Sequence, residues 1–446
     1  MAEAEITPSA AEAEAAYERF IWKNLPRNFA GHFMHGMLGM TGFRLFNAPT
    51  FLPAYLHLLS GSDFMVGLGQ SLQQLGGVVS PVIGATQIEH RKRVLPVAML
   101  MGTLMRLQIL GVALAGFFLH GKAALYAILF FLFLLGLFSG PQSVAFQLLL
   151  AKVIPIARRG RLQALRNVTG GAIAAGLAWF AGRWLIQPKV LGNGYSTTFL
   201  LAFVLTSLGL TALRLLMREP EPPTVREKGR LIDRIRDFPA LFAQDRSFAF
   251  FMLAQTLATA GRVAAPFYIL FAGRSMALSG GNLGLVSLAF LGADTVTNMG
   301  WGLAGDRFGF RSTFVVSLLV WIAATVLLAV APHFPDVRRA APGGLSLGVH
   351  WLIFCAFFGL GAAQSGFMMS SQTMVLEFGA REDIAMRLAL TTTAQGAVSA
   401  IGPLAGGIIA SSLGYGVLFG ASIGFLVLAL IVLVTLVDEP RFRGVA

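Results

Sequence analysis

Long apolar runs alternate with short polar segments along most of the chain. Each run holds about 20 residues or more, the length that a helix needs to cross the roughly 30 Å hydrocarbon core of a bilayer. A polar connector at 218–246 divides them six and six. The pattern predicts an all-α membrane protein with twelve transmembrane helices. The runs lie at about 29–57, 65–86, 95–118, 122–146, 164–186 and 197–217, and then at 248–272, 282–301, 312–332, 348–371, 388–411 and 415–437.

The two sets of six runs repeat each other, with an offset that grows slowly along the chain. The aligned pairs are Arg44 with Arg262 and Gly84 with Gly302 at an offset of 218, Gln142-Ser143 with Gln364-Ser365 at 222, and Arg161-Leu162 with Arg387-Leu388 at 226. Loop insertions between duplicated halves produce such an ordered drift. We therefore expect two pseudo-symmetric six-helix bundles, related by a pseudo-twofold axis, with a central site between them near the bilayer midplane.

The domain organisation follows from these boundaries. We predict an N-terminal segment at 1–28, a first bundle at 29–217, a linker at 218–246, a second bundle at 247–437 and a tail at 438–446. The linker opens with Glu-Pro-Glu-Pro-Pro and then places Leu231, Ile235, Phe238 and Phe242 at helical spacing. This second part is either a short helix on the membrane surface or a solvated connection.

A glycine-punctuated polar turn joins the runs that end near Trp301 and begin near Ser312. It reads Gly302-Leu-Ala-Gly-Asp306-Arg307-Phe-Gly309-Phe-Arg311. Gly309 can adopt the positive φ of a tight reversal. Asp306 can accept hydrogen bonds from the amides of the next helix. Its counterpart in the first half, from Gly84 to Arg93, keeps the glycine and the basic run through Arg91, but the acid is displaced.

This pattern between two membrane helices resembles the signature loop of the major facilitator superfamily of secondary transporters. The resemblance implies two bundles that alternate access to a central cavity, lined mainly by the first, fourth, seventh and tenth helices. It also implies that the two turns act as latches on the cytoplasmic side. The gating residues that we expect are Gly302, Asp306, Arg307, Gly309, Arg311, Gly84 and Arg91.

Composition and charge narrow the possible partners and the compartment. The chain is 56% hydrophobic and 12% charged, and its net charge is +13. Most Arg and Lys residues fall on one side of the predicted membrane, so the positive-inside rule accounts for the excess without a nucleic-acid partner. The same rule places both termini in the cytoplasm. Arg greatly outnumbers Lys, which suggests a GC-rich bacterial genome and an inner membrane.

The sequence offers no basis for enzymatic, metal or cofactor chemistry. Cys355 is the only cysteine, and His32 and His35 have no third ligand nearby. No phosphate-binding or hydrolase motif is present in a suitable setting. The N-terminus lacks the basic and apolar parts of a cleavable signal. We expect a monomer whose partners are a small-molecule solute and the lipid bilayer.

Ionisable side chains within the apolar runs are the main candidates for function, because a charge in hydrocarbon costs at least about 2.5–3.5 kcal/mol. Arg44 and Arg262 fall in the middle of the first and seventh runs. Guanidinium groups facing one cavity would suit a carboxylate, phosphate or sulfate. The alternative is that each anchors its helix to backbone carbonyls.

Asp294, in the eighth run, is the only evident acid in the membrane. It is a candidate either for carrying a coupling proton or for a static pair with Arg262 that locks the second half. Arg44 has no comparable partner in its own half. Gln142, Ser143, Gln364, Ser365 and Gln73 are candidates for hydrogen bonding to a solute, or alternatively for bridging helices.

The leading hypothesis is a proton-coupled carrier of a small organic anion. A second is efflux of lipophilic compounds. Gly402-Pro403 resembles the glycine-proline motif of drug/proton antiporters, but that motif belongs in the fifth helix, where this chain has Gly170-Gly171 without proline. The antiporter motif is thus absent from its diagnostic place, which weakens this reading. A third is a non-transporting receptor or lipid-handling protein on the same scaffold.

Overall fold

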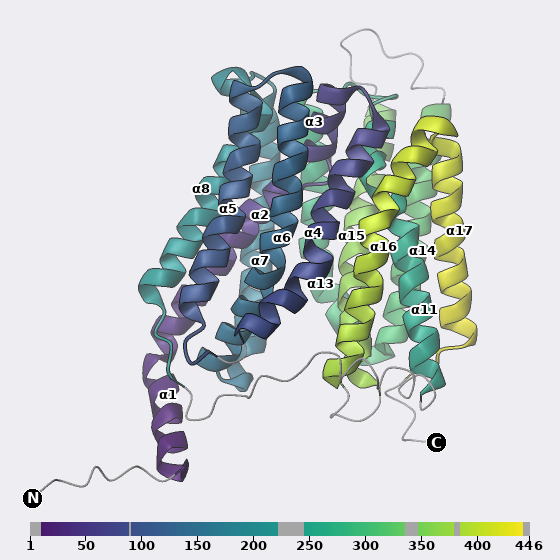
Figure 1. Ribbon diagram of the computed structural model, residues 1–446. Helices are drawn as coiled ribbons and strands as arrows, with labels where there is room; N and C mark the ends of the chain where they lie inside the picture. The colour runs from purple at the N-terminus through teal and green to yellow at the C-terminus, as the bar shows by residue number, and fades with distance from the viewer. Residues whose placement is uncertain (1–9, 89–90, 222–244, 335–346, 379–383, 440–446) are drawn as a thin grey trace, which may run out of the picture.

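The computed structural model describes residues 10–88, 91–221, 245–334, 347–378 and 384–439. Within these ranges the chain is helical throughout, with no strand. The helices stand side by side in two groups, and the start of α1 (Ala10–His35) and the end of α17 (Tyr415–Thr435) lie at the lower end in Figure 1. We call this end the terminal face and the opposite end the distal face. The predicted surface helix of the linker falls outside the described residues.

The prediction of twelve membrane helices in two sets of six is confirmed. The first six are α1 to α3 with the π-helix η1, then α4, α5, α6, α7 with the π-helix η2, and α8. Their bounds are α1 Ala10–His35, η1 Gly36–Met40, α2 Thr41–Phe46, α3 Phe51–Ser60, α4 Asp63–Ile88, α5 Leu95–Phe118, α6 Gly121–Val153, α7 Ile156–Phe180, η2 Ala181–Ile186, η3 Val190–Gly192 and α8 Gly194–Leu216.

The second six begin with α11, which continues through the 3₁₀ segment η4 into α12. Their bounds are α11 Arg246–Gly261, η4 Arg262–Phe267, α12 Tyr268–Ala272, α13 Gly280–Phe308, α14 Phe310–Val330, η5 Ala331–His333, α15 Leu347–Glu377, α16 Ile384–Ser412 and α17 Tyr415–Thr435. Several helices run past the apolar stretches that predicted them. For example, α13 continues to Phe308 and α6 to Val153, because backbone hydrogen bonding extends a helix beyond the hydrocarbon core.

Hydropathy divides the membrane helices into two groups. Among the described residues, eight helical segments are long and apolar enough to span a membrane by themselves. Those that fall short are the interrupted first helix and α4, α7 and α13. Of these, α4 packs against α16 and α13 against α7 of the other bundle, so part of their surface faces protein and not lipid. The most hydrophobic are α14 and α17, and α17 lies at the edge of the second bundle (Figure 1).

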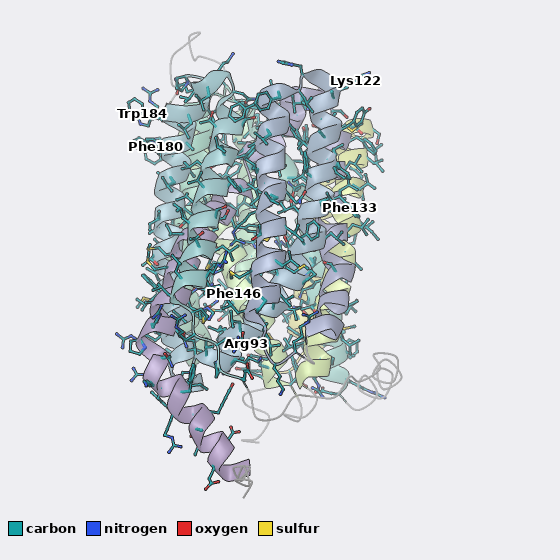
Figure 2. All side chains as sticks on the ribbon, turned by 60° about the vertical axis from the view of Figure 1, so that its left-hand side comes forward. Arg93, Lys122, Phe133, Phe146, Phe180 and Trp184 are labelled. Carbon is teal, nitrogen blue, oxygen red and sulfur yellow. The ribbon has the colours of Figure 1, made fainter. Side chains whose placement is uncertain are left out.

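The outer surface is suited to lipid. Large apolar side chains point outward all around the molecule (Figure 2). Near the distal face, Phe180 and Trp184 project from the edge of the first bundle, and Trp351 is similarly exposed on the second. Exposed tryptophans at the level of a membrane surface form the aromatic belt typical of transmembrane proteins. Lys122 and Arg93 mark opposite ends of the helices in the same view.

The first and seventh membrane helices are broken at corresponding places. The first changes to a π-helix at Gly36–Met40 and is interrupted between Phe46 and Phe51, where Pro49 lies. The seventh tightens into a 3₁₀ segment at Arg262–Phe267, which contains Pro266. Proline removes a backbone donor and disturbs helical geometry. The repeat seen in the sequence therefore reappears as two matching breaks, and Arg44 and Arg262 lie immediately before or at them.

Each bundle is tied at its terminal face by the same device. In the first, the Glu219 carboxylate accepts hydrogen bonds from the amides of Val94 and Leu95, at 2.7 and 2.8 Å. In the second, Glu439 accepts from the amide of Arg311 at 3.0 Å. Both glutamates cap the start of a helix, where free amides and the helix dipole favour negative charge.

The distal halves of the two bundles are in close contact. At Gly67 of α4 an added Cβ would lie 3.2 Å from Cα of Gly407 in α16. At Gly182 of η2 it would lie 2.5 Å from Cα of Gly284 in α13. Glycine lets these backbones approach as larger residues could not. The structure thus shows the distal side sealed.

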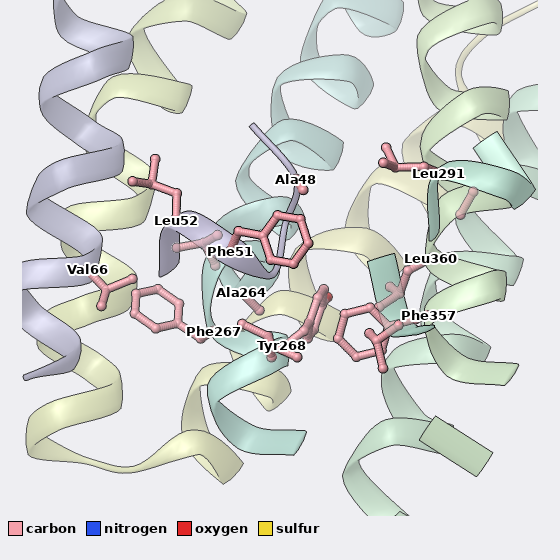
Figure 3. Packing of buried hydrophobic residues seen from close by; sticks show 14 of the residues in the cluster. Ala48, Phe51, Leu52, Val66, Ala264, Phe267, Tyr268, Leu291, Phe357 and Leu360 are labelled. Carbon is pink, nitrogen blue, oxygen red and sulfur yellow. The ribbon is translucent and has the colours of Figure 1, made fainter. Parts of the chain in front are cut away.

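Buried apolar residues complete this seal. Ala48, Phe51, Leu52 and Val66 of the first bundle belong to one cluster with Ala264, Phe267, Tyr268, Leu291, Phe357 and Leu360 of the second (Figure 3). The hydroxyls of Thr50 and Ser287 also hydrogen bond across the interface. Apolar packing therefore closes the path on the distal side of the broken helices.

Candidate functional site

A cavity of about 650 Å³ lies between the bundles beside the broken helices. Its lining residues on α13 and α15 recur every three or four positions, so each of these helices turns one face to the cavity. On α13 they are Phe290, Leu291, Asp294 and Asn298, and on α15 they are Gln364, Ser365, Met368, Met369, Gln372 and Thr373. The first bundle contributes Phe43, Arg44, Asn47, Ala48, Pro49, Pro53, Gln70, Gln163 and Asn167, and η4 adds Arg262, Ala265 and Pro266.

The cavity contains an ion pair that joins the two bundles. Nη1 of Arg44, on α2, lies 3.3 Å from Oδ2 of Asp294, on α13. The same nitrogen lies 3.4 Å from the Thr295 hydroxyl. The side chains of Arg44 and Asp294 are 24% and 19% exposed, so both are accessible from the cavity. Among the lining residues, Asp294 is the only acid.

This pairing corrects the prediction that Asp294 would pair with Arg262 inside the second half. The carboxylate instead binds the arginine that lacked a partner in its own half. Gly171 of α7 makes this possible, because an added Cβ there would lie 2.6 Å from Nη1 of Arg44. The glycine thus leaves room for the guanidinium between the bundles. Among the described residues, the partners of the Arg44 guanidinium are the side chains of Asp294 and Thr295, and no hydrogen bond joins it to a backbone carbonyl.

Arg262 lies against aromatic rings. Its guanidinium carbon is 4.9 Å from the ring centre of Phe367 and 5.5 Å from that of Trp321. Such contacts are worth about 0.5–2 kcal/mol. The Trp321 indole is itself fixed by donating to the Tyr268 hydroxyl at 3.1 Å. In the described residues no carboxylate pairs with Arg262, and its buried Nε makes no hydrogen bond.

The other predicted solute-binding residues divide into two groups. Gln364 and Ser365 line the cavity, and the Ser365 hydroxyl accepts a hydrogen bond from Asn298 at 3.0 Å. Gln142 and Ser143 are not among the lining residues. Gln142 is buried against α5, where an added Cβ at Gly102 would lie 3.1 Å from its Oε1.

Gln73 also lies outside the lining. It donates to Oδ1 of Asn47 at 2.9 Å, and Asn47 does line the cavity. Gln73 therefore contacts a lining residue without lining the cavity itself. The orientation of α4 explains this difference, because the lining residue on that helix is Gln70, three positions earlier.

Polar lining residues outside the predicted set include Asn47, Gln163, Asn167, Gln372 and Thr373. A signal for most of them exists in the sequence. Gln163 and Asn167 are four residues apart, and Gln364, Met368 and Gln372 follow at the same spacing, so each set shares a helix face. Asn47 had no such signal, because it lies in the interruption between α2 and α3.

The predicted latch residues contact their own bundle. Gly309 has φ +85°, as the turn required. Arg311 donates to the carbonyl oxygens of Leu433 and Val434, at 3.0 and 2.6 Å. The amide of Arg311 donates to Glu439 at 3.0 Å, so a carboxylate at the end of the second bundle also caps the start of α14. The turn thus ties α14 to the end of α17.

The remaining latch residues all lie within the described ranges. Gly302 faces Met369 of α15, with 3.7 Å between an added Cβ and the sulfur. Asp306 and Arg307 are exposed. In the first half, Gly84 lies in α4 and Arg91 begins the described chain after the gap at 89–90. A gating role for these residues remains a prediction.

Two histidines near the start of the first membrane helix serve a packing role. His32 and His35 both contact the ring of Phe146, and Nε2 of His35 is 3.3 Å from Nη2 of Arg106. Arg106 also donates to the carbonyls of Thr206 and Gly102, each at 2.7 Å. Across the described ranges no group of His, Cys, Asp and Glu is placed to hold a metal ion.

Comparisons with solved structures show the same architecture. The nucleoside transporter NupG, in a mutant form, superposes with a TM-score of 0.68 at 13% identity, covering 91% of this chain and 99% of the other. The D-xylose-proton symporter gives 0.67 at 14% identity, covering 94% and 98%. At such identities the likeness shows the fold alone. A comparison with curated proteins returned no match.

The sequence profile of the Major Facilitator Superfamily matches this chain twice, at residues 33–258 and 247–445. Each match covers about one half of the protein, in agreement with the duplicated bundles. Together they include both broken helices, the cavity residues and the signature turn. The chain is therefore a member of the major facilitator superfamily, a family of secondary transporters and not of enzymes.

Proposed function

We propose that the protein carries a small organic anion together with a proton. The observation on which this rests is the Arg44–Asp294 pair across the bundles, beside a second arginine without a described carboxylate partner. The cavity lining therefore holds one more cation than acid. Guanidinium groups bind carboxylate, phosphate and sulfate oxygens through paired hydrogen bonds.

The size and apolar parts of the cavity favour an organic solute. Its volume of about 650 Å³ lies within the range of roughly 300–1,000 Å³ that is typical of small-molecule sites. Phe43, Phe290, Met368 and Met369 offer apolar surface to a hydrocarbon part. Gln364, Gln372 and Asn298 offer donors and acceptors to hydroxyl or amide groups.

Competition for Arg44 supplies a coupling mechanism. A solute anion that binds Arg44 displaces Asp294, whose unpaired charge in the cavity is then costly. Asp294 takes up a proton, and the solute and proton cross together. When the solute leaves, Asp294 pairs with Arg44 again and releases the proton. The same fold supports proton-coupled transport in the D-xylose-proton symporter.

Transport by purified protein in proteoliposomes tests the proposal. The assay measures uptake of labelled carboxylates and phosphate esters, with a pH dye inside the vesicles. We expect an inward proton gradient to drive accumulation by the wild type. Asp294→Asn should keep solute exchange but lose accumulation, since its amide carries no transferable proton. Accumulation by Asp294→Asn equal to the wild type would contradict the coupling role.

Arg262→Gln tests the anion site. Losing a charged hydrogen bond to the solute should raise KM roughly 10- to 100-fold. Arg183→Gln is a matched control, because Arg183 is exposed and pairs with Gln187 at the distal face. An unchanged KM in Arg262→Gln would remove this residue from the binding site.

The apolar lining residues favour export of lipophilic compounds as a second candidate. Growth of a host without its own pumps, challenged with a panel of such compounds, separates the two. Protection that survives Arg262→Gln, without anion uptake in vesicles, would favour export.

A further inference from the structure

At the distal face one carboxylate interacts with side chains of both bundles. Asp63 is the first residue of α4. Its Oδ1 lies 3.2 Å from Nδ1 of His57, on α3. From the second bundle, the hydroxyl of Tyr415 interacts with the same carboxylate. The guanidinium of Arg274 lies 4.4 Å from the centre of the Tyr415 ring.

Two glycines with positive φ place these side chains together. Gly61, with φ +63°, ends α3 and reverses the chain, so that His57 and Asp63 face each other. Gly414, with φ +87°, precedes α17 and brings Tyr415 to its first turn. Asp63 also gains from its place at a helix N-terminus, where the dipole favours an anion.

The cluster lies on the line along which the bundles must separate. An added Cβ at Gly407 of α16 would be 2.9 Å from the carbonyl oxygen of Asp63 and 3.1 Å from Cα of Phe64. Opening of the distal face therefore has to weaken the interaction of Asp63 with Tyr415 and its longer-range attraction to Arg274, both in the second bundle. Those with His57 lie within the first bundle and can persist.

The charged and titratable groups around Asp63 are His57, Tyr415 and Arg274. The adjacent part of α16, residues 388–412, has no charged residue. Burial by itself raises the pKa of Asp63, but its interactions with His57, Tyr415 and Arg274 lower it below its ordinary value of 3.8. Asp63 is thus ionised near neutral pH, and histidine is the side chain type whose charge changes between about pH 5 and 8.

We propose that His57 and Asp63 form a proton-binding site that controls opening of the distal face. With His57 neutral, the Asp63 charge attracts Arg274 and holds the bundles together. With His57 protonated, its charge neutralises Asp63 within the first bundle and repels Arg274. The His57 side chain is 38% exposed, so protons from the distal solution reach it. The site is separate from the cavity and depends on bundle movement, not on which solute is carried.

Distance measurements between spin labels test this directly. Labels are attached through Lys122→Cys in the first bundle and Phe334→Cys in the second, both exposed near the distal face, in a Cys355→Ser background. The protein is studied in nanodiscs without solute from pH 8 to pH 5. We expect the population with the longer distance to grow roughly two- to fivefold, the range for a partly exposed ion pair.

The variants identify the group that responds. His57→Gln should remove the pH response, and Asp63→Asn should remove it and favour the open distribution at every pH. His120→Gln is the matched control, since His120 is an exposed histidine that precedes α6 on the same face. It should respond like the wild type. Should Asp63→Asn fail to fold, His57→Gln decides alone.

Two results would overturn the proposal: a wild-type distribution that is the same at pH 8 and pH 5, or a full response in His57→Gln. Asp294→Asn should keep the response, because its carboxylate lies in the central cavity. Since the assay contains no solute, failure here leaves the proposed anion transport standing. Failure of anion transport likewise leaves this site testable.

Discussion

Adding one methyl group at Gly182 should force the sealed distal face open. In the structure, a Cβ at this position would lie 2.5 Å from Cα and 2.6 Å from the nitrogen of Gly284. Both are backbone atoms that cannot turn aside, and ordinary contact begins at 3.4 Å. In Gly182→Ala, η2 and α13 must therefore move apart by at least about 0.9 Å, the difference between 3.4 and 2.5 Å, because the carbonyl oxygen of Gly280 would lie closer still.

The expected magnitude follows from the cost of overpacking. An extra methyl in a tightly packed site costs typically about 1–3 kcal/mol, which corresponds to a roughly 5- to 150-fold change in a two-state population. This cost falls on the sealed conformation alone, because separated helices no longer touch at Gly182. The equilibrium should thus shift toward the distal-open state by that factor.

Cysteine accessibility measures the shift. In a Cys355→Ser background, Asn47→Cys introduces a thiol in the cavity lining, and a membrane-impermeant maleimide labels it from either side of sealed vesicles. Gly182→Ala should increase labelling from the distal side and decrease it from the terminal side. Gly176→Ala is the control, because Gly176 lies on α7 with nothing within 4 Å of an added Cβ. Equal labelling in the two variants would refute the steric argument.

Three further predictions concern stability and can be checked by thermal or acid unfolding in detergent. Glu219→Gln should cost about 1–3 kcal/mol, because a charged acceptor is lost at the two amides that start α5. The control Glu221→Gln should cost under about 1 kcal/mol, since that side chain is 51% exposed. Gly309→Ala should cost about 1–3 kcal/mol, because φ +85° with ψ 151° is a conformation for glycine, whereas Gly300→Ala on α13 should be tolerated. The lowered pKa of Asp63 means that its ionised form contributes stability above pH 3.8, the ordinary value, and that this contribution disappears as the pH falls through the lower folded value. Asp63→Asn should lack this part of the acid transition, and an identical acid profile would contradict the assignment.

Much of the candidate site was predictable from single residues in apolar runs. Arg44, Arg262, Asp294, Gln364 and Ser365 line the cavity, and each stands out because a polar group in a membrane helix is costly. The same reasoning failed for Gln142. The free-energy cost of a polar group in a membrane helix does not tell whether its side chain faces a cavity or a neighbouring helix. Gln142 faces α5.

The internal repeat predicted where two arginines lie along their helices, but not what they contact. It aligned Arg44 with Arg262, and both line the cavity beside breaks in their helices. Their surroundings nevertheless differ, since one pairs with Asp294 and the other lies on the rings of Trp321 and Phe367. Duplication preserves the position of a residue along its helix, whereas its contacts depend on later substitutions in neighbouring helices.

The number of helices, their division into two halves and the family were all determined by the sequence alone, because each depends on local hydropathy, spacing and a contiguous turn. The sealed distal face, the partner of Asp294 and the cluster around Asp63 were decided only by the tertiary structure. Arg44 and Asp294 are 250 positions apart, and their contact depends on how each helix is rotated and how one bundle rests against the other. These are properties of the packed helices, and no local pattern of residues encodes them.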